Sequence, residues 1–145
     1  MVNGEGDGLS GFSVDMYGRY AVVCVPSRAL VGFGRLLTEA VLGLPGFDVD
    51  GAVIKIRGKD PQDRSSKDEI QGQTPPDKLI VHELGAAYEV HLAGALNVGL
   101  FTDMREQRRG MARFAKGRSV LNTFAYTGAL SIAAARGGAR SVTSV

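Results

Sequence analysis

The stretch Arg118-Ser-Val-Leu-Asn-Thr-Phe-Ala-Tyr-Thr-Gly128-Ala-Leu-Ser-Ile-Ala-Ala-Ala135 decides the fold of the second half of the chain. An apolar run, a polar and aromatic turn and an alanine-rich segment follow one another, which predicts a strand, a tight turn and a helix. A helix that begins after a parallel strand presents backbone N–H groups at the carboxyl end of the sheet, where open α/β folds bind nucleotide-like ligands. Residues 141–145 are again β-like, so the pattern predicts the first β-α-β of a cofactor domain.

Composition restricts the classes of function. The chain has 145 residues with 44% hydrophobic and 22% charged content, as in soluble globular proteins. Its apolar runs are shorter than the ~18 residues that span a bilayer, and its N-terminus lacks a signal-peptide pattern. Cys24 is the only cysteine, which excludes an internal disulfide and predicts a small buried apolar residue. These features predict a cytoplasmic protein without a membrane partner.

The region before the cofactor segment predicts a mixed α/β domain over residues 1–96. Two β-hairpins are expected, at 12–25 and 79–92, with Tyr88, Val90 and Leu92 on one face of the last strand. A helix from Ser27 to about Val41 and a strand at 52–56 lie between them, followed by an exposed loop at 57–77. His82 and His91 are interpreted as solvent-facing strand residues, although a metal pair stays conceivable.

The second predicted domain covers residues 97–145 and opens with a basic helix. Asp103 and Glu106 form a D-x-x-E capping pattern for a helix that runs to about residue 115. Six cations fall in fourteen residues, against one acid: Arg105, Arg108, Arg109, Arg113, Lys116 and Arg118. Such a run is either a solvated helix face or a patch that meets phosphates.

The turn at 122–128 keeps one glycine where the helix begins, unlike the three-glycine dinucleotide pattern. Thr127 is expected to cap the helix and to leave neighbouring N–H groups for a carboxylate or hydroxyl. Phe124 and Tyr126 could line a site for an apolar or cationic group of a ligand. A plain β-turn-α connection with a core phenylalanine explains the same residues.

The segment Asn122-Thr-Phe-Ala-Tyr-Thr-Gly128 resembles the N-x-F-x-Y-T-G motif of a bacterial family. This family is the class I S-adenosylmethionine-dependent methyltransferases of 23S ribosomal RNA, of the cytosine-C5 type. Three further segments are similar to the same family, in the same order. They are the opening from Asp7 to Gly18, Gln71-Gly-Gln-Thr-Pro-Pro76 with Val81-His-Glu83, and Gly99-Leu-Phe-Thr-Asp-Met-Arg105.

The resemblance implies a middle α/β domain followed by the start of a Rossmann-like methyltransferase domain, with S-adenosylmethionine as cofactor. It implies an RNA-binding domain upstream and a catalytic half downstream, with the cysteine nucleophile beyond Val145. We therefore expect a fragment that is inactive alone and that contains no catalytic residue. The uncovered β-α-β is expected to be poorly protected or rescued by self-association as a homodimer.

The same resemblance implies two sets of site residues and 23S rRNA as the partner. The expected cofactor-binding residues are Phe101, Asp103, Arg105, Asn122, Phe124, Ala125, Tyr126, Thr127 and Gly128. The expected RNA-binding residues are Arg108, Arg109, Arg113 and Lys116.

Two alternatives stay open at this point. Asn97-Val98 and Met104 depart from the cytosine-C5 pattern, and Leu100-Phe101 is closer to a branch that methylates guanine N7 in the same RNA. A non-catalytic RNA-binding fragment is the alternative from another class of function.

Overall fold

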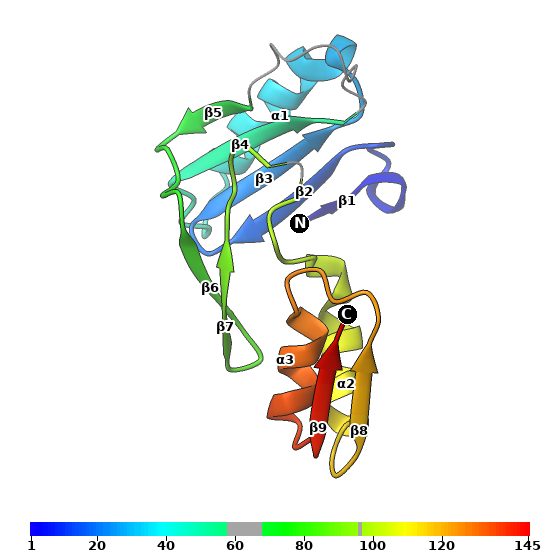
Figure 1. The fold of residues 1–145 in the computed structure, drawn as a ribbon. Helices are drawn as coiled ribbons and strands as arrows, with labels where there is room; N and C mark the ends of the chain where they lie inside the picture. The colour runs from blue at the N-terminus through cyan, green and yellow to red at the C-terminus, as the bar shows by residue number, and fades with distance from the viewer. Residues whose placement is uncertain (58–67, 96) are drawn as a thin grey trace. The chain divides into compact units, whose positions relative to one another are not determined.

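A computed structural model describes residues 1–57, 68–95 and 97–145, and these form two compact units (Figure 1). Unit 1 contains Met1–Leu79 and the short segment from His91, and unit 2 contains Ile80–Val90 and Asn97–Val145. Each is described by itself. The α/β fold with hairpins and a final β-α-β that the sequence predicts is confirmed.

Unit 1 is built on a five-stranded mixed sheet in the order β1-β2-β3-β4-β5. The strands are β1 (Val2–Asn3), β2 (Ser13–Tyr17), β3 (Tyr20–Val25), β4 (Gly51–Ile56) and β5 (Glu69–Gly72). β3 and β4 pair in parallel, while the other neighbours are antiparallel. The central strands β3 and β4 are almost wholly buried, which matches their continuous apolar runs.

Helix α1 (Val31–Leu42) connects the two parallel strands and lies against the sheet in Figure 1. Two short 3-10 segments, η1 (Gly4–Asp7) and η2 (Arg28–Leu30), complete the unit. A Cβ at Gly34 would lie 2.5 Å from Val25 Cγ2, so glycine lets the helix approach the sheet closely. Val14, Val23 and Ile54 are fully or almost fully buried beneath the helix and form the centre of the core.

The predicted loop at 57–77 is wrong over residues 69–72, because these form β5 at the sheet edge. Residues 58–67 of that prediction lie outside the described residues.

Beside β5, Lys55 Nζ is buried and donates to Asp68 at 2.8 Å and to the Ala95 carbonyl at 2.6 Å. Gly94 N–H also donates to Asp68, so a buried ion pair ties β4 to the segment before residue 96.

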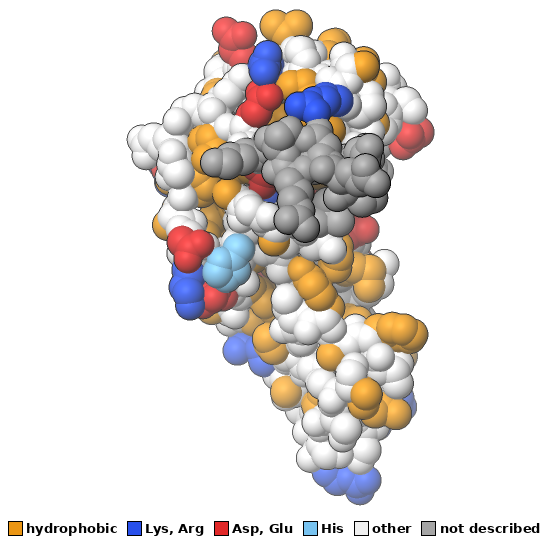
Figure 2. Space-filling view, turned by 45° about the horizontal axis from the view of Figure 1, so that its top comes forward, with side chains coloured by type: hydrophobic (Ala, Val, Ile, Leu, Met, Phe, Trp, Pro, Cys, Tyr) orange, Lys and Arg blue, Asp and Glu red, His pale blue; other side chains and the backbone are white. Residues whose placement is uncertain are grey.

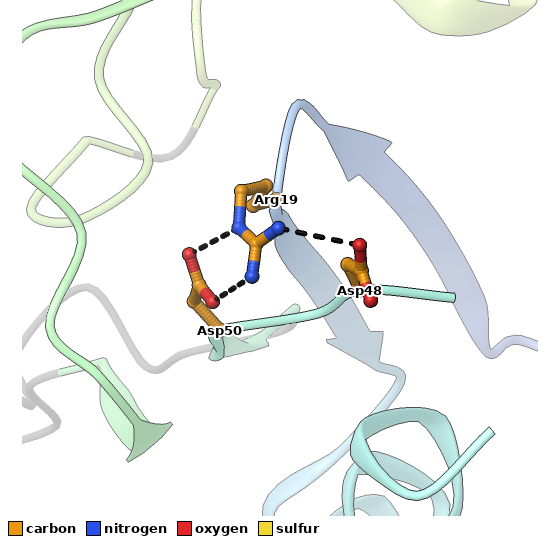
Figure 3. Close-up of polar contacts among 3 residues, drawn as sticks. All are labelled: Arg19, Asp48 and Asp50. Carbon is orange, nitrogen blue, oxygen red and sulfur yellow. Dashed lines mark hydrogen bonds and ion pairs between the residues drawn. The ribbon is translucent and has the colours of Figure 1, made fainter. Parts of the chain in front are cut away.

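Arg19 holds the start of β4 next to the β2–β3 turn (Figure 3). Its Nε and Nη2 donate to the Asp50 carboxylate at 2.7 and 2.6 Å, and Nη1 lies 3.4 Å from Asp48. The Asp50 N–H donates to the Arg19 carbonyl at 2.8 Å. The guanidinium hydrogen bonds hold the pKa of Asp50 below its usual value.

Unit 2 begins with the two-stranded sheet of β6 (Leu79–Glu83) and β7 (Ala86–Val90). Then come η3 (Thr102–Met104), α2 (Arg105–Phe114), β8 (Ser119–Asn122), α3 (Ala129–Arg136) and β9 (Ser141–Ser144). β8 and β9 pair in parallel with Ser119 opposite Ser141, and α3 packs against both strands. A Cβ at Gly137 would lie 2.0 Å from the Ala112 carbonyl oxygen, so α2 and α3 meet through their backbones.

Two smaller expectations are confirmed, those for Cys24 and for the buried face that ends at Leu92. Cys24 is buried and free, and Tyr88, Val90 and Leu92 are all buried. His82 is exposed on β6 as expected, whereas the expectation is wrong for His91, which follows β7, is half-buried and has Nδ1 3.9 Å from Asp77 Oδ1. Among the described residues, the helices are too short or too polar to cross a membrane.

Candidate functional site

The candidate site is the turn at residues 122–128, between β8 and α3. Asn122 anchors its start, because Nδ2 donates to Ser131 Oγ at 2.9 Å and Oδ1 accepts the Phe124 N–H at 3.4 Å. Gly128 ends it in the left-handed region, with φ +82°, and donates its N–H to the Ala125 carbonyl at 2.7 Å. The turn is therefore tied to both flanking elements.

Tyr126 adopts a backbone conformation that non-glycine residues seldom take, with φ +49°. Tyr126 is 57% exposed, and Phe124 is 90% exposed. The competing interpretation of Phe124 as a core residue is therefore wrong. Strained residues that display side chains to solvent are typical of ligand sites.

Thr127 does not cap α3. Gly128 occupies the N-cap position, and the described structure shows no side-chain capping hydrogen bond there. The Thr127 hydroxyl instead donates to the Gly99 carbonyl at 2.5 Å. Gly99 has φ +105°, and a Cβ there would lie 3.4 Å from the Glu89 carbonyl oxygen, so the 99–101 segment passes close to β7. Thr127 thus joins the turn to this segment.

The joined segment brings a second aromatic ring to the turn. Phe101 and Tyr126 lie with ring centroids 5.4 Å apart and tilted by 41°. Both rings are about half-exposed. Residues that are 25 positions apart in sequence therefore form one exposed aromatic surface beside the turn.

Asp103 and Arg105 follow directly after Phe101, and both are exposed. The predicted capping box is wrong, because α2 begins after Met104 and this described helix end has no side-chain capping hydrogen bond. Asp103 lies within the 3-10 turn η3, where it is the acidic group of the first turn. Its carboxylate consequently faces solvent two residues from the Phe101 ring.

Arg108 is the residue whose predicted role must be corrected. It was expected to bind RNA, but only 2% of its side chain is exposed. Its Nε and Nη2 donate to the two Glu83 carboxylate oxygens at 2.6 and 2.8 Å, and Nη1 donates to the Phe101 carbonyl at 2.9 Å. A guanidinium enclosed in this way is satisfied by protein groups and cannot reach a phosphate.

This arrangement also shows what sequence reasoning missed. Glu83 lies in the first strand of the predicted hairpin at 79–92. No pattern in the sequence indicates that its carboxylate pairs with Arg108, 25 positions later. Through Arg108 it fixes the carbonyl of Phe101, while Thr127 fixes the carbonyl of Gly99. The 99–101 segment is therefore held at both ends.

The other predicted RNA-binding cations are exposed on α2 and just after it. Arg109 and Arg113 lie four residues apart, which places them on one face of α2, and Lys116 follows in the turn after the helix. Arg109 is 3.0 Å from Glu106, an exposed pair that contributes little to stability.

The chemistry of these groups fits a sulfonium nucleoside with an amino-acid tail. Exposed aromatic faces at Phe101 and Tyr126 suit a cationic sulfur, because the face of an aromatic ring attracts positive charge. The exposed Asp103 carboxylate suits an ammonium group. The start of α3 suits a carboxylate, since the positive end of the helix dipole lies there.

Comparison with known proteins agrees with this chemistry. Residues 53–145 match the family of S-adenosylmethionine-dependent methyltransferases. A Bacillus subtilis (strain 168) protein, provisionally named as a ribosomal RNA large subunit methyltransferase, is 37% identical over the whole chain. The ribosomal RNA large subunit methyltransferase K/L of Shewanella amazonensis is 37% identical over 92% of the chain. The chain spans 37% and 19% of the lengths of these two relatives.

A solved structure gives the same result for the fold. The crystal structure of a provisionally described methyltransferase complexed with SAH superposes on 99% of the chain with a TM-score of 0.83. The two sequences are 32% identical, and the match covers 36% of that protein.

Proposed function

The chain belongs to the S-adenosylmethionine-dependent methyltransferases, and from this premise we propose that it supplies part of the cofactor site of a large-subunit rRNA methyltransferase. The observation that carries the proposal is the pairing of Phe101 with Tyr126 beside the strained turn. A connecting turn by itself requires neither a tyrosine with positive φ nor its contact with an exposed phenylalanine from another segment.

The residues of the proposed site would bind different groups of the cofactor. Phe101 and Tyr126 would contact the sulfonium group, and Asp103 would bind the ammonium group of the amino-acid tail. The turn from Asn122 through Phe124, Ala125 and Thr127 to Gly128 would hold the carboxylate at the start of α3. The exposed guanidinium of Arg105 would add a positive charge near the bound cofactor. The bound cofactor supplies an electrophilic methyl group.

We propose cytosine C5 of 23S rRNA as the target, on the four-segment resemblance. The competing target is guanine N7, which the Leu100-Phe101 pair favours. The two relatives described above are both 37% identical to the chain over the residues matched, and neither name states a target base. Product analysis by mass spectrometry of digested 23S rRNA, after reaction with the full-length enzyme, would distinguish the two modified nucleosides.

Arg109 and Arg113 on α2, and Lys116 just after it, are the proposed RNA contacts. Their exposure suits phosphate binding, which supplies most of the affinity of nonspecific RNA binding. A non-catalytic RNA-binding role predicts the same contacts, so cofactor binding is the measurement that separates these two functions.

The proposed site is tested by adding S-adenosylmethionine, which carries the sulfonium group, at about 1 mM to the isotopically labelled chain and recording backbone NMR shifts. Shifts confined to residues near Phe101, Asp103, Tyr126 and Gly128 are expected. Tyr126→Ala should abolish them, whereas Phe114→Ala, which removes an exposed ring from α2, should leave them unchanged. Shifts at other residues, or equal binding by Tyr126→Ala, would overturn the proposed site.

A further inference from the structure

The charges of the chain are unevenly distributed. Residues 107–145 contain seven of its 17 lysines and arginines and none of its 15 aspartates and glutamates. The whole chain nevertheless carries a net charge of only +2. A block of one charge sign in an otherwise mixed chain is a feature of surfaces that bind an oppositely charged partner.

The fold gathers part of this charge at one end of unit 2. The turn between α2 and β8 meets the turn between α3 and β9, because Gly117 N–H donates to the Gly138 carbonyl at 2.8 Å. Arg140 N–H donates to the Arg118 carbonyl at the same distance. Lys116, Arg118 and Arg140 are exposed on these two turns, and we call them the basic tip. Figure 2 shows blue side chains and no red ones at this end of unit 2.

The basic tip lies at the opposite end of the β8–β9 sheet from the turn at 122–128. Both strands begin at the tip, since they are parallel, and both end beside the turn. Four-residue strands separate the two ends by about 13 Å. The tip is therefore distinct from the proposed cofactor site.

Local stability does not account for two of these cations. Cations stabilise the last turn of a helix, which explains Arg113 in α2 and Arg136 in α3. Arg118 and Arg140 come four residues after the ends of those helices and immediately precede neighbouring strands. Because the Arg140 N–H donates to the Arg118 carbonyl, these two like charges lie on adjacent segments, where their repulsion is destabilising. Arg140 Nη2 donates to Ser119 Oγ at 3.0 Å, which orients the guanidinium without neutralising it.

We propose that the basic tip binds the phosphate backbone of the RNA substrate. The phosphates bound there belong to nucleotides other than the one that is placed at the cofactor. This inference rests on the proposed function, since it takes the substrate to be RNA. The exposed face of α2 supports it, because Arg105, Arg109, Arg113 and Lys116 form a row about 16 Å long between the cofactor end and the tip. A linear row of cations matches a strand of phosphates better than it matches a compact acidic patch on a protein. Phe114 is 70% exposed beside the tip and offers a surface on which a base can stack.

The test measures the salt dependence of RNA binding by the full chain without cofactor. Fluorescence anisotropy with a labelled single-stranded RNA is recorded for wild type, Arg118→Gln, Arg140→Gln and the double variant. Arg57→Gln, which removes an exposed arginine from unit 1, is the matched control. Each lost phosphate contact should lower the slope of log K against log salt by about 0.7 and weaken binding roughly fivefold at about 0.1 M salt.

The double variant should lose about twice as much slope as either single variant. Thermal unfolding should show that its stability is close to that of wild type, because it loses both the like-charge repulsion and the exposed hydrogen bond from Arg140 to Ser119. An unchanged slope in the double variant, with wild type still binding RNA, would overturn the basic tip alone. Absence of RNA binding by wild type would instead count against the proposed RNA substrate. If poly-L-glutamate of matched charge displaces the labelled RNA as well as unlabelled RNA does, the basic tip binds an acidic protein partner instead, and the inference is refuted.

Discussion

Replacing Arg108 with methionine should destabilise unit 2 more than any other single change among its cations. The substitution keeps much of the side-chain volume but leaves the Glu83 carboxylate without the guanidinium that now binds both of its oxygens. Both side chains are buried, with 2% and 11% exposed. Removing one partner of a buried ion pair costs about 3–5 kcal/mol, because the remaining charge stays desolvated. The hydrogen bond to the Phe101 carbonyl adds about 1 kcal/mol.

The assay is urea unfolding followed by circular dichroism, with three comparison variants. Arg109→Met, on the same helix but exposed, should change the unfolding free energy by less than about 1 kcal/mol. Glu83→Met alone should be as damaging as Arg108→Met. The double variant Arg108→Met/Glu83→Met should recover most of the loss, since apolar replacement of a buried pair is often neutral.

A second measurement separates the positioning of Phe101 from plain stability. The ring signals of Tyr126 in an NMR spectrum depend on the Phe101 ring beside it. They should shift in Arg108→Met and stay unchanged in Arg109→Met, under conditions in which both variants are folded. The reasoning is refuted if Arg108→Met costs less than about 1 kcal/mol, or if the losses of the two single variants simply add in the double variant.

Three further predictions concern other contacts. Thr127→Val removes the hydroxyl that binds the Gly99 carbonyl, and should cost about 1 kcal/mol and weaken SAH binding, whereas Thr123→Val should do neither. Leu84→Asn should raise the unfolding free energy by about 0.5–1 kcal/mol, because Leu84 has φ +50° and an Asn-Gly turn suits this conformation; a loss of stability would contradict the strain argument. Arg19→Gln should raise the pKa of Asp50 in an NMR titration, since the guanidinium lowers it. The pair stabilises the fold above the ordinary aspartate pKa and loses this effect as pH falls through the lowered pKa, so the stability difference between wild type and Arg19→Gln should shrink in acid.

The sequence predicted those helices and strands whose residue pattern depends only on neighbouring positions. The alternation that ends at Leu92, the apolar run of β4 and the strand-turn-helix around Asn122 all depend on neighbouring residues, and the structure confirms them. β5 was missed because Glu69-Ile-Gln-Gly72 has one apolar residue and pairs through its backbone at a sheet edge. An edge strand needs little hydrophobicity, so composition carries almost no signal for it.

Long-range contacts explain the errors within the candidate site. Asp103 and Thr127 both sit where capping residues are common, yet Thr127 binds the carbonyl of Gly99, 28 positions earlier. Arg108 and the exposed Arg109 are neighbours in the sequence, and Arg108 is buried where its guanidinium pairs with Glu83 of β6. Helical periodicity could have separated the two arginines, but it cannot identify the partner.

The 99–101 segment, held by Thr127 at one end and by Arg108 at the other, has a thermodynamic consequence. Any ligand that binds more tightly when Phe101 is held in place must, by reciprocity, strengthen the contacts that hold it. Occupancy at the aromatic pair and order in the β6–β7 hairpin are therefore linked quantities. Slower amide exchange at Glu83 on ligand binding, and weaker ligand binding when the hairpin is loosened, would be two measurements of one coupling free energy.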